Sequence, residues 1–170
     1  MAKSYKVTSD PFYVNGSLQM SAVDTYTEQE ISLPLDSLNQ EGVLVHAIYF
    51  TSSRPELIPA AQYRQLMQVT TTTKTGIINA NDANLLARRE ISVAGGVAEF
   101  SGPHVIDLVG EEGPYQESDN LGIVATDNIF VGMDTEAATL VGSVQFRAVM
   151  SRIKIQPAAY AALVTNELSS

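Results

Sequence analysis

The stretch VQFRAVMSRIKIQPAAYAALVTNEL, residues 144–168, joins a long run of β-favouring residues to an alanine-rich tail that begins at Pro157. In the first half of the run, apolar and polar residues alternate, as they do in a strand with one buried face. Phe146 therefore faces one side of the predicted strand, and Arg147 faces the opposite side. The prediction of the fold starts from this strand because it is the longest in the chain and leads directly into a helix-like tail.

The alternation changes phase near Met150 and Ser151, where Arg152 and Lys154 take the face that had been apolar. A strand has a side-chain period of two, so a phase change requires an extra residue or a change of the buried side. One interpretation is a β-bulge at Met150–Ser151. The other is a strand that crosses from the core to a contact surface. Arg152 and Lys154 are expected where the strand leaves the core.

The tail predicts a helix over about 157–168, since proline suits the first turn of a helix. Tyr160, Leu163 and Leu168 then recur at helical spacing. A helix of about 11 residues is roughly 16 Å long, which is too short to be stable alone. It must pack either on its own domain or on a neighbouring copy of the chain, and the sequence leaves both arrangements open.

The rest of the chain consists of short β-favouring runs separated by turn residues such as Asn15-Gly16, which gives about eight strands in all. The run GVLVHAIYF, residues 42–50, is apolar on both faces and is predicted to be a central strand covered on both sides. Strands do not alternate with long helices, which argues against an α/β fold. The pattern is typical of an all-β sandwich or antiparallel barrel.

One segment departs from this pattern. In NANDANLLARRE, residues 79–90, Asn81 or Asp82 can cap a helix that carries Leu85 and Leu86. The sequence therefore predicts a short internal helix here.

Length, composition and charge restrict the possible functions. The chain has 170 residues, no cysteine, and 10 Lys and Arg against 19 Asp and Glu, for a net charge of −9. This length predicts one domain over residues 1–170. The absence of cysteine excludes disulfides and thiolate chemistry, and the acidic surface disfavours direct nucleic-acid binding. The N-terminus predicts no secretory signal, and no apolar run is long enough to span a bilayer.

The sequence holds no nucleophile elbow, P-loop or dinucleotide-binding motif. We therefore expect no catalytic residue, no cofactor and no enzymatic activity. His46 and His104 are the two histidines, and no H-x-H pair or third histidine accompanies them. His46 lies among apolar residues, so a hydrogen-bonded histidine in the core or at its rim is expected rather than a metal ligand. A jelly-roll enzyme with a metal near one of these histidines is a further alternative.

The acidic loop at residues 107–119 is the best candidate for a cation site because calcium prefers carboxylate and carbonyl oxygens. It lacks EF-hand spacing, so a solvated acidic loop is the other interpretation. Its carboxylates are Asp107, Glu111, Glu112, Glu117 and Asp119. Tyrosines such as Tyr49 and Tyr63 are candidates for an aromatic platform that binds sugars, although the chain has no tryptophan and its aromatic residues form no clear stripe.

Three stretches give the chain a familiar layout: DPFYVNGSLQMSAVDTYTEQEISLPL at 10–35, NIFVGMDT at 128–135 and VQFRAVMSRIKIQPAAYAALV at 144–164. With them the chain resembles the small single jelly-roll major capsid proteins of tailless icosahedral viruses that infect bacteria or archaea. The resemblance covers most of the chain as a layout and contains no diagnostic motif. It implies a single jelly-roll domain that assembles into a capsid shell of the virion and is made in the host cytoplasm.

The resemblance also implies partners: other copies of the chain and other capsid proteins. Lys3 and Lys6 are too few for a basic arm that grips the genome. An internal membrane or another protein layer is therefore expected between such a shell and the genome. The alternative function is a carbohydrate- or ligand-binding β-sandwich module. The candidate residues for a subunit interface are Arg147, Arg152, Lys154, Tyr160, Leu163 and Leu168.

Overall fold

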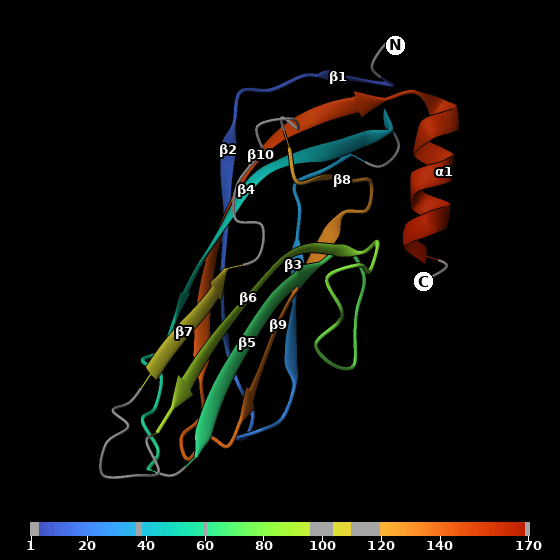
Figure 1. Ribbon diagram of the computed structural model, residues 1–170. Helices are drawn as coiled ribbons and strands as arrows, with labels where there is room; N and C mark the ends of the chain where they lie inside the picture. The colour runs from blue at the N-terminus through green and yellow to red at the C-terminus, as the bar shows by residue number, and fades with distance from the viewer. Residues whose placement is uncertain (1–3, 37–38, 60, 96–103, 110–119, 169–170) are drawn as a thin grey trace.

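The computed structural model describes residues 4–36, 39–59, 61–95, 104–109 and 120–168, with the backbone alone at 104–109 and 166–168. These ranges hold ten strands and one helix (Figure 1). The elements are β1 (Tyr5–Val7), β2 (Phe12–Gln19), β3 (Thr27–Ser32), β4 (Glu41–Ser52), β5 (Gln62–Thr70), β6 (Leu85–Ala94), β7 (His104–Val109), β8 (Gly122–Val124), β9 (Asn128–Glu136), β10 (Ser143–Ile155) and α1 (Pro157–Leu168).

The order in which the strands pair is that of a jelly roll. β5 pairs with β6, β4 with β8, β3 with β9 and β2 with β10, all antiparallel. These four pairs nest inside one another along the chain, as they do when one long hairpin is wrapped into a two-sheet sandwich. The expected all-β jelly-roll fold is therefore confirmed, with ten strands in place of about eight, because β1 adds to β10 and β7 adds to β6.

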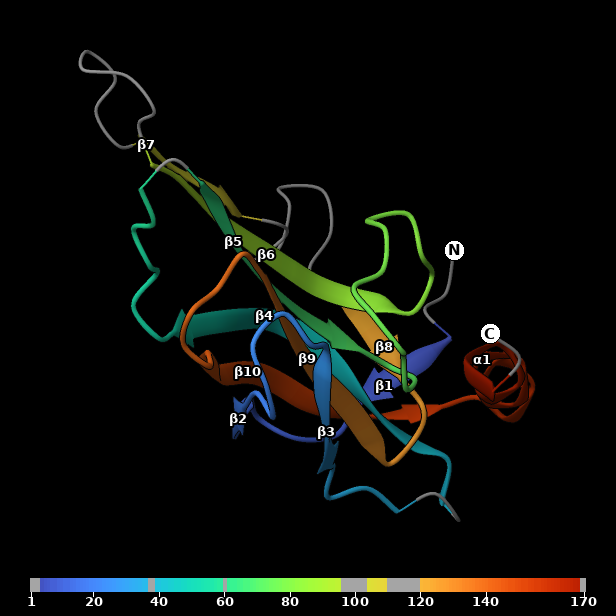
Figure 2. The ribbon, with the colours of Figure 1, turned by 90° about the horizontal axis from the view of Figure 1, so that it is seen from below.

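The strands form two sheets that lie one above the other (Figure 2). Sheet A contains β2, β10, β4 and β8, with β1 beside the end of β10. Sheet B contains β3, β9, β5, β6 and β7 in that order. Because the sheets are antiparallel and face each other, each strand buries every second side chain between them.

The main core fills the space between the two sheets. Its buried members include Val45, Ile48, Met67, Ile129 and Met133, which are essentially inaccessible to solvent. The turn predicted at Asn15-Gly16 is wrong, because both residues lie inside β2 and pair with Arg147 and Phe146 of β10. A glycine suits this position, since the ring of Phe146 occupies the space that a Cβ at Gly16 would need.

The phase change predicted in β10 comes from its neighbour. Val149 lies opposite Ala47 and Met150 opposite Val45, so His46 is an extra residue in β4. The β-bulge therefore lies in β4 and not at Met150–Ser151 of β10, as one interpretation of the sequence had placed it. β10 itself keeps a side-chain period of two.

What changes along β10 is the side that is covered, as the second interpretation stated. Phe146 and Met150 are buried in the main core, whereas Ile153 and Ile155 are buried on the opposite face of the sheet. Arg147 is exposed opposite Phe146, as predicted.

The extra residue also explains the two apolar faces of β4. Val43 and Val45 face the main core before the bulge, and Ile48 and Phe50 face it afterwards. On the outer side Leu44 and Ala47 are buried, whereas Tyr49, further along the strand, is exposed. The predicted central strand is confirmed, since β4 lies between β10 and β8. Cover on both sides holds except at Tyr49, and part of the apparent second apolar face is the core face after a phase change.

A second, smaller cluster lies on the outer face of sheet A, beneath α1. Leu44, Ala125, Ile153 and Ile155 are buried there, and apolar residues of α1 pack against them. The helix spans Pro157–Leu168, in agreement with the predicted bounds. Of the two arrangements that the sequence left open, the helix takes the one on its own domain.

The predicted internal helix at 79–90 is wrong. The carboxylate of Asp82 accepts a hydrogen bond from the backbone N–H of Asn84 at 2.9 Å, which closes a tight turn. A side chain that bonds its own backbone two residues on competes with helix formation. The chain then continues as β6, and Leu86 and Ala87 are buried in the main core.

Candidate subunit interface

Three loops meet at one end of the sandwich, the lower end in Figure 1. They connect β2 to β3, β4 to β5 and β9 to β10. Each loop joins strands of opposite sheets, so together they close this end of the main core. We call this surface the loop end and define it by residues 20–26, 53–61 and 137–142, of which residue 60 lies outside the described ranges.

Asp24 joins the first of these loops to the third. Its carboxylate accepts hydrogen bonds from the hydroxyl of Thr135 at 3.2 Å and from the backbone N–H of Ala138 at 3.0 Å. Its own N–H donates to the Thr135 hydroxyl oxygen at 3.0 Å. Asp24 has a φ of 49°, in the left-handed region that aspartate tolerates better than most residues. The local conformation of this residue is therefore set by contacts made with β9 and the loop after it.

Glu56 joins the second loop to the third. It accepts hydrogen bonds from the backbone N–H groups of Thr139 and Leu140, at 3.1 and 3.0 Å, and from the hydroxyl of Thr139. Partial burial acts to raise the pKa of Glu56, but these hydrogen bonds outweigh it and hold the pKa below its usual value. The ionised carboxylate is therefore the form that organises the loop.

These contacts leave large apolar side chains in solvent. Leu140 is 68% exposed, Leu57 57%, Val141 44% and Val23 38%. Single exposed apolar residues are common, but several on one surface are typical of a contact with another protein. The loop end can therefore bind a protein surface through an apolar patch with the carboxylates of Asp24 and Glu56 close by.

The sequence did not predict these four residues as interface residues. Leu140 and Val141 are apolar and precede VQFRAV in the chain, so the sequence pattern alone predicts them as part of the last strand. The structure starts β10 at Ser143, since the Glu56 carboxylate holds the backbone of Thr139 and Leu140 in the loop. An apolar pair beside a glycine, at the boundary of a strand, is the signal that the sequence offered.

The predicted interface residue Arg147 lies on the outer face of sheet A. Its guanidinium lies over the ring of Tyr13, 5.3 Å from the centroid, and its Nε donates to the side chain of Asn15 at 3.1 Å. Tyr49 faces it from β4 in register. These residues line a shallow groove of about 650 Å³, in which Tyr13 is 64% exposed and Tyr49 53% exposed.

Arg152 and Lys154 lie at the other end of sheet A. Arg152 is half-buried beyond Met150, and Lys154 is exposed two residues further on. Both lie on the same face of β10 as Met150, which packs in the main core. They lie beyond the last residue of β10 that the main core contains. This agrees with the prediction that they mark where the strand leaves the core.

The helix residues are partly occupied by the chain itself. Tyr160 and Leu163 are half-buried because they pack on the second cluster, against residues such as Leu44 and Ile153. The side chain of Leu168 lies outside the described residues. Of the six predicted interface residues, the structure brings Arg152 and Lys154 together and places Arg147 apart from them, on the outer face of the sheet.

The histidine and tyrosine candidates are placed as follows. His46 is half-buried, and its Nε2 and the hydroxyl oxygen of Ser151 form a hydrogen bond of 2.9 Å, so its expected place at the rim of the core is confirmed. Tyr63 is only 2% exposed, so it cannot form part of a sugar platform. His104 and Asp107 lie in β7, where the structure describes the backbone alone.

Three further observations concern ligands and membranes. Residues 110–119 of the acidic loop lie outside the described ranges, and so does the calcium prediction that depends on them. Among the described residues, no group of three or more metal-ligating side chains is placed to hold a metal ion. The described part of the chain has no helix with the length and apolar character needed to cross a membrane.

Comparisons with known proteins give structural similarities but no family. No protein-family model matches the chain, and no curated protein matches it. Among solved structures, the chain is similar to one titled Desmodium yellow mottle tymovirus, with 11% sequence identity and a TM-score of 0.26. The match covers 86% of this chain and 90% of that chain. The identification of the fold rests on the strand order described above.

Proposed function

We propose that this protein is a structural virion protein, a jelly-roll subunit that assembles with copies of itself into an icosahedral capsid shell. The observation that carries the proposal is the loop end, where Asp24 and Glu56 fix three loops and large apolar side chains such as Leu57 and Leu140 remain exposed. Contact with another subunit removes this apolar surface from water, which favours association.

The packing of the sandwich supports a role for its outer surfaces. Side chains of both sheets fill the space between them, so the surfaces available for function lie on the loops, the outer sheet faces and the strand ends. A subunit of a closed shell needs more than one contact surface on a single rigid body, because each copy meets several neighbours. The jelly roll presents such surfaces on paired strands and on loops held by hydrogen bonds.

The resemblance to small single jelly-roll capsid proteins supports a more specific proposal for the virus, the location and the partners. We infer that the shell belongs to a tailless icosahedral virus of bacteria or archaea, and that the protein is made in the host cytoplasm and resides in the virion. Its partners are other copies and other capsid proteins. The net charge of −9 repels nucleic acid, so an internal membrane or another protein layer separates the shell from the genome.

Sedimentation velocity at increasing protein concentration tests the role of the loop end. The wild-type chain is expected to form assemblies, and the Leu57→Ser/Leu140→Ser variant is expected to remain largely monomeric under the same conditions. Tyr49→Ser is a matched control, because it also removes an exposed large side chain, from the outer face of sheet A. A double variant that assembles like the wild type would contradict the proposed role of the loop end.

A second candidate function is supported by the groove on sheet A. Tyr13, Arg147 and Tyr49 combine two exposed aromatic rings with a guanidinium that has donors to spare. Aromatic faces with a few polar groups beside them suit a sugar or another small polar ligand. This arrangement supports the alternative of a carbohydrate- or ligand-binding module.

Binding to a glycan array distinguishes this alternative. A ligand of the groove should bind the wild-type chain and the Leu57→Ser/Leu140→Ser variant equally, and binding should be lost in Tyr49→Ala. Tyr63→Ala is unsuitable as a probe, because Tyr63 is a core residue. Absence of binding to every glycan tested, in a chain that assembles, would favour the structural role over glycan recognition.

A further inference from the structure

Three cations gather at the end of sheet A that lies opposite the loop end. Lys6 of β1 lies directly opposite Lys154 of β10, and Arg152 occupies the same face two residues along the strand. Among the described residues, none of these three side chains takes part in an ion pair. On its other side Lys154 lies opposite Glu41 of β4, so the cluster holds three cations and one carboxylate. Like charges directly opposite one another destabilise a sheet, so this cluster, which we call the basic end, favours a further anionic partner.

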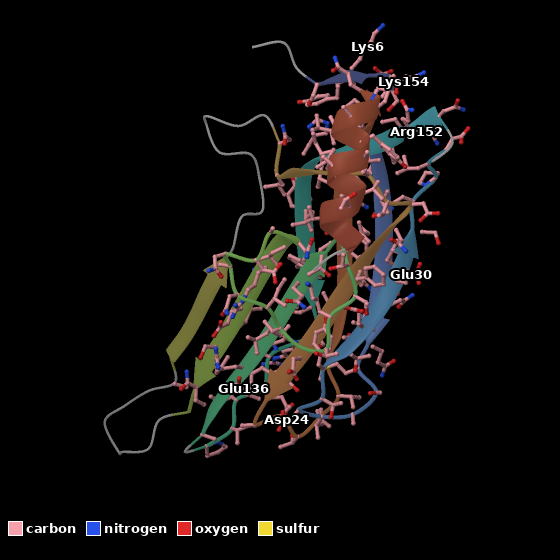
Figure 3. All side chains as sticks on the ribbon, turned by 90° about the vertical axis from the view of Figure 1, so that its right-hand side faces the viewer. Lys6, Asp24, Glu30, Glu136, Arg152 and Lys154 are labelled. Carbon is pink, nitrogen blue, oxygen red and sulfur yellow. The ribbon has the colours of Figure 1, made fainter. Side chains whose placement is uncertain are left out.

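The basic end is hollowed as well as charged. A groove of about 610 Å³ lies beside it, and Tyr5, Lys6, Lys154 and Pro157 are among its lining residues. The groove lies between β1 and the start of α1, at the upper end of the molecule in Figure 3. A protein surface can therefore seat against it, with the two lysines at the rim.

The charges of the chain are divided between its two sheets. The strands of sheet A contain four cations and a single carboxylate, whereas the strands of sheet B contain three cations and six carboxylates. The charged residues of sheet A are Lys6, Glu41, Arg147, Arg152 and Lys154. Those of sheet B are Glu28, Glu30, Arg64, Arg88, Arg89, Glu90, Asp107, Asp134 and Glu136.

Four carboxylates of sheet B share its outer face on two neighbouring strands. Glu28 and Glu30 of β3 alternate with the inward residues, and the register of β3 on β9 places Asp134 and Glu136 on the same side. Figure 3 shows Glu30 and Glu136 away from the labelled cations of the basic end. We call these four residues the acidic face.

Little within the described residues neutralises the acidic face, although the carboxylate of Glu28 accepts hydrogen bonds from Tyr26, Thr73 and the backbone of Lys74. Among the described residues, Arg64 is its only ion-pair partner, through Glu136 at 2.7 Å. Burial raises the pKa of Asp134, and the nearby charges of Glu136 and Asp24 raise it further. Glu30 is exposed and accepts one hydrogen bond, from the side chain of Asn128 at 2.8 Å.

We propose that the basic end of one copy docks on the acidic face of a second copy, so that Lys6, Arg152 and Lys154 meet the carboxylates of β3 and β9. This inference rests on the proposed self-assembly and specifies one of its contacts. Complementary charge favours the second copy as the occupant, because one chain carries both surfaces. A net charge of −9 does not prevent the contact, since salt at physiological concentration screens charges beyond about 8 Å.

The contact is heterologous, because two different surfaces of the chain meet. Every copy then has one basic end and one acidic face free to continue the contact, which leads to rings or extended rows rather than to an isolated dimer. Such a contact complements the loop end, which buries apolar surface. Its strength should fall steeply as salt is added, because it depends on exposed charges.

Charge reversal tests the proposal in the full chain. Lys6→Glu/Lys154→Glu and, separately, Glu30→Lys are each expected to weaken self-association about tenfold or more, because several attractive pairs become repulsive. Lys154→Glu is compared with Arg147→Glu, which makes the same charge change at an exposed position outside both the basic end and the loop end. Self-association that is unchanged by these reversals, or weakened equally by Arg147→Glu, would contradict the proposal.

Mixing the two variants separates this contact from the loop end, which is the same in both. Labelled Glu30→Lys protein keeps its basic end, and unlabelled Lys6→Glu/Lys154→Glu protein keeps its acidic face. Two wild-type copies can form the contact in either of two orientations, whereas the mixed pair can form it in one. The two variants should therefore bind each other about as tightly as two wild-type copies do, apart from a factor of about two. Failure of the mixture to bind, when the wild type associates, would overturn the contact and leave the proposed function standing.

Two further results would also contradict the proposed contact. A wild-type chain that stays monomeric at every concentration and salt tested would contradict both the contact and the proposed shell function. Vesicles of phosphatidylglycerol provide the remaining arm, because an anionic membrane is the alternative partner for a cation cluster. Binding of monomeric protein to these vesicles that is lost in Lys6→Glu/Lys154→Glu would assign the basic end to a membrane and overturn the proposed contact.

Discussion

Sheet A carries apolar clusters on both faces, and the two differ in depth. The main core lies between two sheets and holds fully buried side chains such as Phe146 and Met150. The second cluster lies between the same sheet and a single helix, whose Tyr160 and Leu163 are only half-buried. One strand, β10, serves both, which shows how a strand with an unbroken period of two can bury opposite faces in succession.

The comparison implies that the two clusters contribute unequally to stability. Burial between two sheets removes a side chain from water on all sides, whereas a 12-residue helix on the outer face leaves one side open. The main core should therefore unfold with the whole domain. The helix should be able to leave the sheet without global unfolding, because local openings have a lower free energy than the global transition.

Phe146→Ala tests the main core and has the largest expected effect. The ring packs in the core and against Gly16, so its loss should lower the free energy of unfolding by about 3–5 kcal/mol. Urea denaturation followed by circular dichroism measures this change. A loss below about 1 kcal/mol, comparable with an exposed position, would show that this half of β10 does not hold the two sheets together.

Leu163→Ala tests the second cluster and should have a smaller effect, about 1–2 kcal/mol, because the side chain is half-buried. Hydrogen exchange of the α1 amides should accelerate, while the amides of β5 and β9 keep their protection. Ala162→Ser, on the exposed face of the helix, is the control. Equal acceleration throughout the domain would contradict the idea that the helix opens separately.

Acidification tests the loop end, which belongs to neither cluster, and should have the smallest effect on stability. Hydrogen bonds hold the pKa of Glu56 below its value in the unfolded chain, which is about 4.5. Their contribution is therefore complete above that pH and is lost as the pH falls through the lower pKa of the folded state. Exchange of the Leu140 amide should increase in this range, and Glu56→Gln should remove the pH dependence. A Leu140 amide that is insensitive to both changes would show that Glu56 does not hold the loop.

Much of the fold could be predicted because local patterns and tertiary packing agree. The alternation around Phe146, the proline at 157 and the helical spacing of Tyr160 and Leu163 each reflect a real element. The predicted helix at 79–90 failed because the Asp82 side chain bonds its own backbone and because β5 offers β6 a partner strand. Helix propensity is a weak guide where tertiary pairing is available.

The candidate interface was less predictable, for a physical reason. Arg152 and Lys154 stood out in the sequence because charges interrupt an apolar pattern. Leu140 and Val141 did not, because apolar residues beside a strand look like part of it. Their exposure depends on Glu56, which is more than 80 positions away along the chain. The apolar pair beside Gly142 is the only local signal of this contact, so it takes the folded structure to place these side chains on the surface.

Electron microscopy of the purified chain at high concentration tests the central claim most directly. We expect uniform closed or ring-shaped assemblies of the wild type, and separate subunits for the Leu57→Ser/Leu140→Ser variant imaged beside it. Separate subunits in the wild-type sample, at every concentration and salt tested, would contradict the conclusion that this jelly roll is a subunit of a self-assembling shell.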